Sequence, residues 1–415
     1  MSALNRQLGA FEHFIWSTDQ WSPRQFAYVV RISGPLTANE LRRGLTAAQA
    51  RHPVLQSTIA MRETGPWFVP TALKIPLRVI PRSSDERWRS ETIQELRDPF
   101  LPGAAPLMRV AFLRGPQTSE LIFIVHHSIG DGLSTLYFVR DVLRAIHREP
   151  LHKLPPTPSA DSFVLSDVPR FAPEVTKRSE SFPKPAGPII TTAELDADAL
   201  QLLIHRSRVE GTTVHGAFTA ALLLAAQSEF ENGKPVSALQ PVSLRPLNSQ
   251  MGESLGLYIS AAIVSLEKNT GPDLWDFARS VKKQLQPALD AQAMGARYSA
   301  LRAFVSSNPT PLEAYNHYRR GVGHDLVVSN KGRLPFERQI GRLRIDAIWS
   351  VPNVEMEPFV SLLTVGERMF ITAVAERSMR KLLDCTITRI RQSIGKPLTA
   401  PNYTCLTSNN KIDIK

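Results

Sequence analysis

Proline placement constrains the fold of this 415-residue chain more than any other feature of its sequence. The stretch from 150 to 188 holds nine of the 32 prolines. Proline removes a backbone donor and fixes φ, so such a stretch continues neither a helix nor a central strand. We therefore expect an extended linker over residues 150–188, lying on the surface between two folded pieces.

The pieces on either side of this linker both mix helices and strands. In residues 1–149, Phe26–Ile32 alternates in the manner of a half-buried strand. In residues 189–415, an apolar helical pattern covers Thr213–Ser228 and a strand pattern covers Leu362–Val374. The predicted fold class is therefore mixed α/β (α+β) in both halves.

Composition excludes several classes of protein. Hydrophobic residues at 43% and charged residues at 21% are ordinary globular values, so a wholly disordered chain is excluded. Two cysteines, Cys385 and Cys405, are too few for a disulfide scaffold or a cysteine-rich metal site. The first residues lack a signal-peptide pattern, and the longest apolar stretch, Gly216–Ala226, is shorter than the ~18 residues of a membrane span. We expect a soluble, cytoplasmic protein with no transmembrane segment.

The chain is basic, with 49 Lys and Arg against 38 Asp and Glu and a net charge of +11. Such a balance favours an anionic partner: nucleic acid, a membrane surface, or a phosphorylated or acidic substrate. The sequence contains no known nucleic-acid-binding motif and no basic stripe with interleaved aromatic residues. We therefore expect no nucleic-acid partner.

One segment indicates chemistry, a His-His-x-x-x-Asp-Gly pattern over residues 126–132 that follows an apolar strand. Successive strand side chains point to opposite faces, so His126 and His127 cannot share one face. The two glycines of the segment allow a tight turn before a helix. A histidine at this strand end has an unperturbed pKa of about 6.5, which suits proton abstraction at neutral pH. Asp131 could hold the turn in shape or orient the imidazole.

Two plainer interpretations compete with a catalytic one. A metal site would need converging ligands, but the two histidines diverge and no third His or Glu lies nearby at ligand spacing, so we predict no metal. Alternatively, both histidines are satisfied core residues, which is the usual fate of a lone histidine. A pair followed by Gly-x-Gly around an aspartate is less typical of a core. On the residues alone, this second interpretation stays open.

The segment resembles the HHxxxDG motif of the chloramphenicol-acetyltransferase-like acyltransferase superfamily. That superfamily includes nonribosomal peptide condensation domains, polyketide-associated acyltransferases and plant BAHD acyltransferases. Among these, the chain is most similar to the stand-alone polyketide-associated O-acyltransferases. Four weaker similarities follow the family's order from residue 8 to about 332: the early motif at Leu8–Trp16, RHxxL at Arg51–Leu55, the strand carrying N/D-x-R at Pro241–Arg245, and SNxG at Val328–Gly332.

The resemblance implies an architecture and a mechanism. Two similar mixed-sheet subdomains, 1–149 with the HHxxxDG motif and 189–415, would enclose a tunnel at their interface. His127 would be the general base that deprotonates an acceptor, which attacks an acyl thioester without a covalent acyl-enzyme. Asp131 would be structural and would pair with Arg245, and His126 would be a packing residue.

Further site residues are implied by the same resemblance. The backbone N–H of Gly132 would approach the tetrahedral oxyanion, and Ser134 or Ser329 could donate to it. Ser329 and Asn330, from the SNxG segment, are candidates for the substrate channel, as is Ser134. No bound cofactor is implied, because the donor is itself a substrate: acyl-coenzyme A, or an acyl-phosphopantetheine carrier protein.

The expected activity is that of an acyltransferase in lipid or polyketide biosynthesis, with an alcohol as acceptor. Amide formation on an amine by the same histidine is the alternative, and a non-catalytic docking protein is another. Ser243 stands where the family has Asn or Asp, and the plant DFGWG segment is absent. We expect a monomer whose carrier partner acts in trans, with basic residues at the tunnel mouth docking donor phosphates.

A competing motif, G-x-S-x-G around Ser254, matches the nucleophile elbow of α/β-hydrolases. An elbow requires an apolar strand before the serine and a helix after it. The preceding residues are polar and contain proline, and the residues from Leu257 onward have a strand pattern. A Ser254 hydrolase is therefore a remote alternative.

Overall fold

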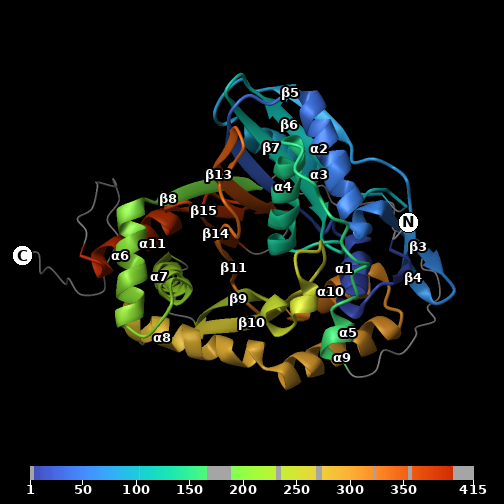
Figure 1. Ribbon diagram of the computed structural model, residues 1–415. Helices are drawn as coiled ribbons and strands as arrows, with labels where there is room; N and C mark the ends of the chain where they lie inside the picture. Colours follow the sequence, from blue (N-terminus) through green and yellow to red (C-terminus); the bar gives the residue numbers. More distant parts are fainter. Residues whose placement is uncertain are drawn as a thin grey trace, which may run out of the picture.

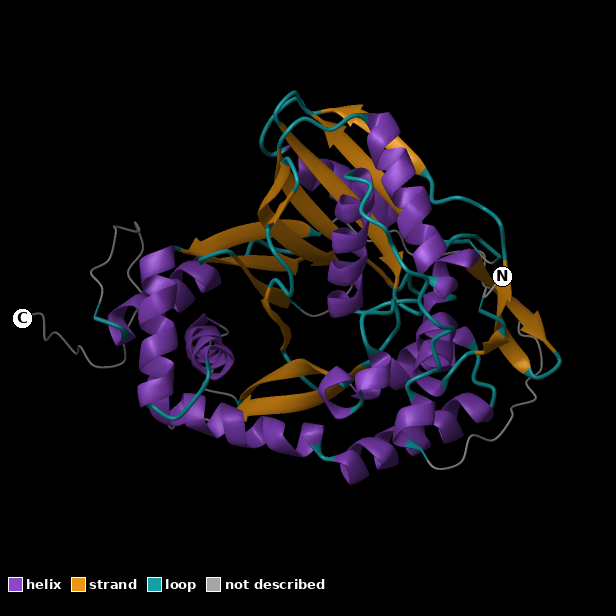
Figure 2. Cartoon of the chain, in the orientation of Figure 1, coloured by secondary structure: helices purple, strands orange, loops and turns teal. Residues whose placement is uncertain are grey.

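The computed structural model describes residues 4–101, 103–165, 188–229, 235–267, 273–321, 323–353 and 358–395. Two six-stranded mixed sheets with helices around them form the body of the protein (Figures 1 and 2). The predicted mixed α/β class with two mixed sheets is confirmed. Of the expected linker, residues 166–187 lie outside the described residues, and the described part before them contains only a short helix, α5 (Asp161–Val164).

The first sheet carries the strand that leads to the HHxxxDG segment. Its two central strands are buried on both faces because Phe26–Val30 and Leu121–Val125 are almost entirely apolar. Only the outermost pair, β5 and β6, runs parallel. In spatial order its strands are β12 (Gln339–Ile340), β13 (Leu343–Pro352), β2 (Gln25–Ser33), β7 (Thr118–His126), β6 (Met108–Arg114) and β5 (Leu77–Pro81).

The second sheet is built from the residues after 188. Its third strand, β11, runs parallel to both of its neighbours, and the remaining pairs are antiparallel. In spatial order the strands are β10 (Ile259–Leu266), β9 (Val236–Ser243), β11 (Leu326–Arg333), β14 (Phe359–Val365), β15 (Arg368–Ala375) and β8 (Ile189–Leu195). A separate three-stranded sheet contains β1 (Arg6–Gln7), β4 (Gly65–Pro70) and β3 (Ser57–Arg62).

The chain crosses between the two large sheets at β13. This strand comes late in the sequence but pairs with β2 in the first sheet, while it also contacts β14 and β15 of the second. Its Trp349 ring stacks on the Trp88 ring, with centroids 4.6 Å apart, and meets the Phe370 ring edge-on. Residues after 188 therefore contribute to both sheets. The strands β12 and β13 belong to the second half of the sequence but to the first sheet in space.

Helices cover the outer faces of the sheets. Helix α2 begins at a capping box in which Thr37 and Glu40 each accept the other's backbone N–H. It packs against α4 beside the first sheet, and α7 packs against α8 and α11 beside the second. The residue ranges of these and the other helices are α1 (Ala10–Asp19), α2 (Ala38–Arg51), α3 (Arg87–Arg97), α4 (Gly132–Ile146), α6 (Ala197–Val209), α7 (Val214–Glu229), α8 (Leu274–Leu285), α9 (Ala291–Ser306), α10 (Pro311–Gly321) and α11 (Arg380–Ser393).

A membrane-spanning helix is not found among the described residues. No single helix there is both long and apolar enough to cross a bilayer. The pair α6 and α7 reaches that length and composition only when joined, and the two helices are bent by 100° at their junction.

Candidate active site

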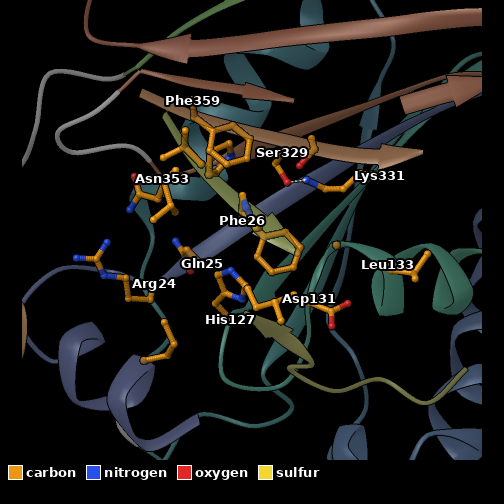
Figure 3. Close-up of a pocket in the computed structure, with 18 of the residues that line it drawn as sticks. Arg24, Gln25, Phe26, His127, Asp131, Leu133, Ser329, Lys331, Asn353 and Phe359 are labelled. Carbon is orange, nitrogen blue, oxygen red and sulfur yellow. Dashed lines mark hydrogen bonds between the residues drawn. The ribbon is translucent and has the colours of Figure 1, made fainter. Parts of the chain in front are cut away.

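A cavity with a volume of about 300 Å³ lies between the two six-stranded sheets. Its wall is formed by strands of both sheets, by α1 and α10, and by the turn between β7 and α4. Most of that wall is apolar, with Phe11, Ile15, Phe26, Leu133, Leu239, Ile259, Val327 and Phe359. Figure 3 labels some of the polar side chains that line it: Arg24, Gln25, His127, Asp131, Ser329, Lys331 and Asn353.

His127 follows β7 directly and lines this cavity (Figure 3). Its backbone N–H donates to the carbonyl of Arg24 at 2.8 Å, which continues the β2–β7 ladder past the strand end. Its Nδ1 lies 2.9 Å from the carbonyl oxygen of Gly130. Because a carbonyl oxygen only accepts, Nδ1 of the neutral ring carries the proton and Nε2 keeps its lone pair. The Phe26 ring packs against the imidazole edge-on, with centroids 4.9 Å apart.

Burial sets the protonation state of His127. Desolvation lowers its pKa below the usual 6.5, and the Gly130 carbonyl and the Asp131 carboxylate offset this only in part. The imidazole is therefore neutral at pH 7. A neutral ring with an unprotonated Nε2 beside a cavity can accept a proton from a bound hydroxyl or amine.

His126 faces away from His127, as the alternation of a strand requires. Its side chain is 2% exposed, its Nδ1 accepts the backbone N–H of Ser128 at 3.1 Å, and its Nε2 lies 3.4 Å from a carboxylate oxygen of Asp19. The two histidines thus have separate surroundings.

Across the described ranges, no group of three or more His, Cys, Asp or Glu is arranged to hold a metal ion.

Asp131 is the N-cap of α4, and both of its carboxylate oxygens are engaged. Oδ1 accepts the backbone N–H of Ser134 at 2.8 Å. Oδ2 accepts from Nη1 of Arg245 at 2.8 Å and from the backbone N–H of Tyr258 at 2.9 Å. Burial alone would raise the pKa of Asp131, but Arg245 and the two backbone donors outweigh it and hold that pKa below its usual value. The expected Asp131–Arg245 ion pair is present, and it links the first half of the chain to the second.

Gly132 begins α4 and lines the cavity. A Cβ atom at this position would lie 2.5 Å from Cε of Lys331 and 2.6 Å from Oη of Tyr28. These distances are shorter than any normal contact. A larger residue here would force the Lys331 and Tyr28 side chains to move, so their close approach favours glycine.

Ser134, one of the expected channel residues, is not among those that line the cavity. It is fully buried, and its hydroxyl accepts from the backbone N–H of Asp131 and contacts the carbonyl of Gly256 at 3.1 Å. As the third residue of α4, it turns back toward the N-cap in a capping box, which directs it away from the cavity. The expectation of a channel role for Ser134 is thus corrected.

Ser329 and Asn330 both line the cavity. The Ser329 hydroxyl is hydrogen-bonded to Nζ of Lys331. The Asn330 side chain accepts the backbone N–H of Gly332 at 2.7 Å, at an irregularity in the pairing of β11 with β14. Asn330 therefore shapes the backbone, while Ser329 presents its hydroxyl beside a lysine.

His52, from the RHxxL segment, stabilises the site from a distance. It is fully buried, and its Nε2 lies 2.9 Å from a carboxylate oxygen of Asp141 on α4. Its Nδ1 accepts the backbone N–H of Leu255 at 3.2 Å. Leu255 lies three residues before Tyr258, whose N–H binds Asp131. The RHxxL segment thus holds the residues around Leu255 and Tyr258 close to the N-cap of α4.

The sequence reasoning missed several polar residues of the cavity wall, among them Arg24, Tyr28, Lys331 and Asn353. The sequence motif could have identified Lys331, because it directly follows Ser329 and Asn330 in the SNxG segment. Tyr28 belongs to an apolar strand pattern, and that pattern does not indicate a polar role for its hydroxyl. Arg24 and Asn353 flank strands and carry no local signal of a site.

Ser254 does not lie in a nucleophile elbow. The residues before it form two short 3₁₀ turns, η2 (Arg245–Leu247) and η3 (Ser249–Met251), and the next element after it is the strand β10. An elbow has the reverse arrangement, strand before and helix after. The local structure excludes the hydrolase alternative at this serine.

Sequence comparison finds relatives among biosynthetic synthases. No family model matches the chain. A region of chondramide synthase from Chondromyces crocatus is 31% identical over 186 residues, which is 41% of this chain and 5% of the synthase. The chain matches only 1–5% of the length of this and three further curated relatives. Those relatives include a cyclosporin synthetase and a polyketide synthase.

Structure comparison covers nearly the whole chain. The trichothecene 15-O-acetyltransferase TRI3 of Fusarium sporotrichioides matches with a TM-score of 0.67 and 14% identity, over 94% of this chain and 95% of that one. Polyketide synthase associated protein 5 of Mycobacterium tuberculosis matches with a TM-score of 0.65 and 16% identity, over 94% and 98%. Other matches include condensation domains, one of them solved with C8-CoA and Leu-SNAC. The chain therefore shares its fold with these acyltransferase and condensation-domain structures.

Proposed function

We propose that the protein transfers an acyl group from a thioester to an acceptor hydroxyl, with His127 as general base. The observation that carries this proposal is the neutral imidazole of His127, with Nδ1–H bound to Gly130 and Nε2 unprotonated, on the wall of a cavity between the two sheets. The similarity in fold to an O-acetyltransferase supports the choice of oxygen as the acceptor atom.

The reaction needs one proton transfer in each direction. Nε2 of His127 takes the hydroxyl proton as the acceptor oxygen attacks the thioester carbonyl carbon. The tetrahedral intermediate then collapses, the C–S bond breaks, and the imidazolium returns the proton to the leaving thiolate. Products are an ester and a free thiol, and no acyl-enzyme forms. Holding both substrates in one cavity contributes through proximity.

The remaining motif residues support His127 in this proposal. Asp131, bound to Arg245 and to two backbone N–H groups, keeps the turn after His127 in shape. Gly132 brings the start of α4 to the cavity wall, where its N–H can stabilise the oxyanion. The donor in this proposal is an acyl-coenzyme A or an acyl carrier protein, and the bound C8-CoA of one structural neighbour supports that class of donor.

Amide formation on an amine is the second candidate. The observation that favours it is the similarity in sequence to a probable nonribosomal peptide synthetase and in fold to condensation domains. The same Nε2 would remove the proton from an ammonium or amine acceptor. Acceptor chemistry therefore separates the two candidates.

A thiol-release assay tests the proposed function directly. Purified protein, incubated with acyl-coenzyme A donors of several chain lengths, should release free thiol when an alcohol is supplied, and more slowly with an amine of the same shape. Release with amines alone would favour amide formation. If neither coenzyme A nor carrier-protein donors gave release with any acceptor, the proposal would be wrong.

The pH dependence should follow the protonation of His127. Because the base acts in its neutral form and burial lowers its pKa, kcat/KM should rise with pH through an apparent pKa below 6.5. Activity is therefore lost as the pH falls through that value. Steady-state rates between pH 5 and 8 measure this rise of kcat/KM with pH, after donor hydrolysis is subtracted at each pH. An apparent pKa well above 6.5 for this rise would contradict the assignment of the His127 imidazole as base.

A further inference from the structure

We infer that the cavity contains a carboxylate-binding subsite formed by Lys331, Ser329 and Tyr28, so that one of the substrates carries a free carboxylate. This inference deepens the proposed function and rests on it for the statement that the ligand is a substrate. The subsite itself follows from the geometry and charge of the cavity wall.

Lys331 is held in place by its neighbours on three sides. It lies on β11, and its aliphatic carbons pass over Gly132 at the start of α4. Its Nζ is hydrogen-bonded to the Ser329 hydroxyl, as Figure 3 shows, and lies 5.5 Å from the centroid of the Phe359 ring. The ammonium is therefore positioned on the cavity wall before any ligand arrives.

The charge of Lys331 has no counter-ion in the part of the chain that the structure describes. Asp131 is the only acidic residue among the described residues that line the cavity. Its Oδ2 is occupied by Arg245 and Tyr258, and its Oδ1 by the helix cap. Burial lowers the pKa of Lys331 to about 7, and Asp131 offsets this only in part. A bound carboxylate would supply the missing negative charge.

Tyr28 provides a second, independent observation at the same place. Its side chain is fully buried, and its hydroxyl has the Ser350 side chain on the paired strand as a polar neighbour but makes no hydrogen bond of ordinary geometry to the described residues. Both this hydroxyl and Cε of Lys331 lie within 2.6 Å of one point, the position of a Cβ on Gly132. A ligand oxygen beside that point can accept from the tyrosine and from the ammonium.

The surroundings indicate which kind of anion fits. One ammonium and two hydroxyls suit a carboxylate, whereas phosphate is usually met by several N–H donors or by the fork of an arginine. The wall around the subsite is apolar, with Leu239, Ile259 and Val327 on the second sheet. The ligand is therefore a carboxylic acid whose remaining part is apolar.

Calorimetry with hexanoate and hexanamide tests the subsite on the full chain. The two probes differ in charge but hardly in shape. Hydrogen bonds to a charged group contribute about 1.5–3 kcal/mol, so wild-type protein should bind hexanoate about 10–100 times more tightly than hexanamide at pH 6.5. Equal affinities would overturn the inference without the need for any variant.

Variants then assign the preference to Lys331. Lys331→Met should abolish the preference for hexanoate, and Lys331→Arg should keep most of it. Lys282→Met is the matched control, because Lys282 lies on α8 with its Nζ exposed and bonded to the Gly211 carbonyl; it should bind both probes as the wild type does. Wild-type affinity for hexanoate in a folded Lys331→Met protein would overturn the inference.

The affinity for hexanoate should also fall as the pH rises above about 7, because Lys331 then loses its proton. The titratable groups that face it are Asp131 at the start of α4 and Tyr28 on β2; Asp131 stays ionised and the buried Tyr28 stays neutral over this range. His127 on the same wall is already neutral. Lys331→Arg should remove the dependence, since a guanidinium keeps its charge. The binding measurement needs no turnover, so a failure of the subsite and a failure of acyl transfer are distinguishable.

Discussion

The His127→Ala variant should transfer acyl groups about 10²–10⁴ times more slowly than the wild type, which is the usual contribution of a general base. The change removes the only group proposed to accept the acceptor's proton. It should leave the fold intact, because the imidazole lies on the cavity wall rather than in the core and its hydrogen bond is to the Gly130 carbonyl in the adjacent turn. The measurement is kcat from thiol release, together with the melting temperature.

The matched control is His205→Ala. His205 is exposed on α6 and does not line the cavity, so its loss should change neither turnover nor stability. Full turnover by a stably folded His127→Ala protein would remove His127 from the mechanism. A large fall in its melting temperature would mean that the histidine is a structural residue, the plainer of the two interpretations of the motif.

The Asp131→Ala variant should be less stable than the wild type by about 3–5 kcal/mol, the cost of breaking a buried ion pair from one side. The Arg245 guanidinium would be left buried without its carboxylate, with its side chain only 8% exposed. The N–H groups of Ser134 and Tyr258 would lose their acceptors as well. The free energy of unfolding from denaturant titration measures the loss, and activity should fall with it.

A double-mutant cycle identifies the cause of that loss. Arg245→Met in the Asp131→Ala background removes the unpaired charge, so the double variant should recover part of the stability that Asp131→Ala loses. Asp131→Asn should be milder than Asp131→Ala, because its amide oxygen can still accept the Ser134 N–H at the helix cap. Strictly additive losses would mean that the ion pair does not link the two halves energetically.

The outcomes for single residues show which expectations a sequence can support. The divergence of His126 from His127 follows from strand alternation, which is local, and the structure has it. The Asp131–Arg245 pair came from family resemblance and is present across a separation of 114 residues. A channel role for Ser134, two residues after the motif, was implied by the family resemblance. The expectation failed because a capping box turns the third helical residue back to the N-cap.

The sequence by itself determined the mixed α/β class, the strand, turn and helix around HHxxxDG, and the resemblance to the acyltransferase superfamily. Each of these depends on local periodicity or on residues that are neighbours along the chain. Only the tertiary structure decided that β13 joins the first sheet, that His52 holds Leu255, and that Lys331 and Tyr28 meet over Gly132. Those contacts depend on which distant strands pair and in what register, and no local pattern records that choice.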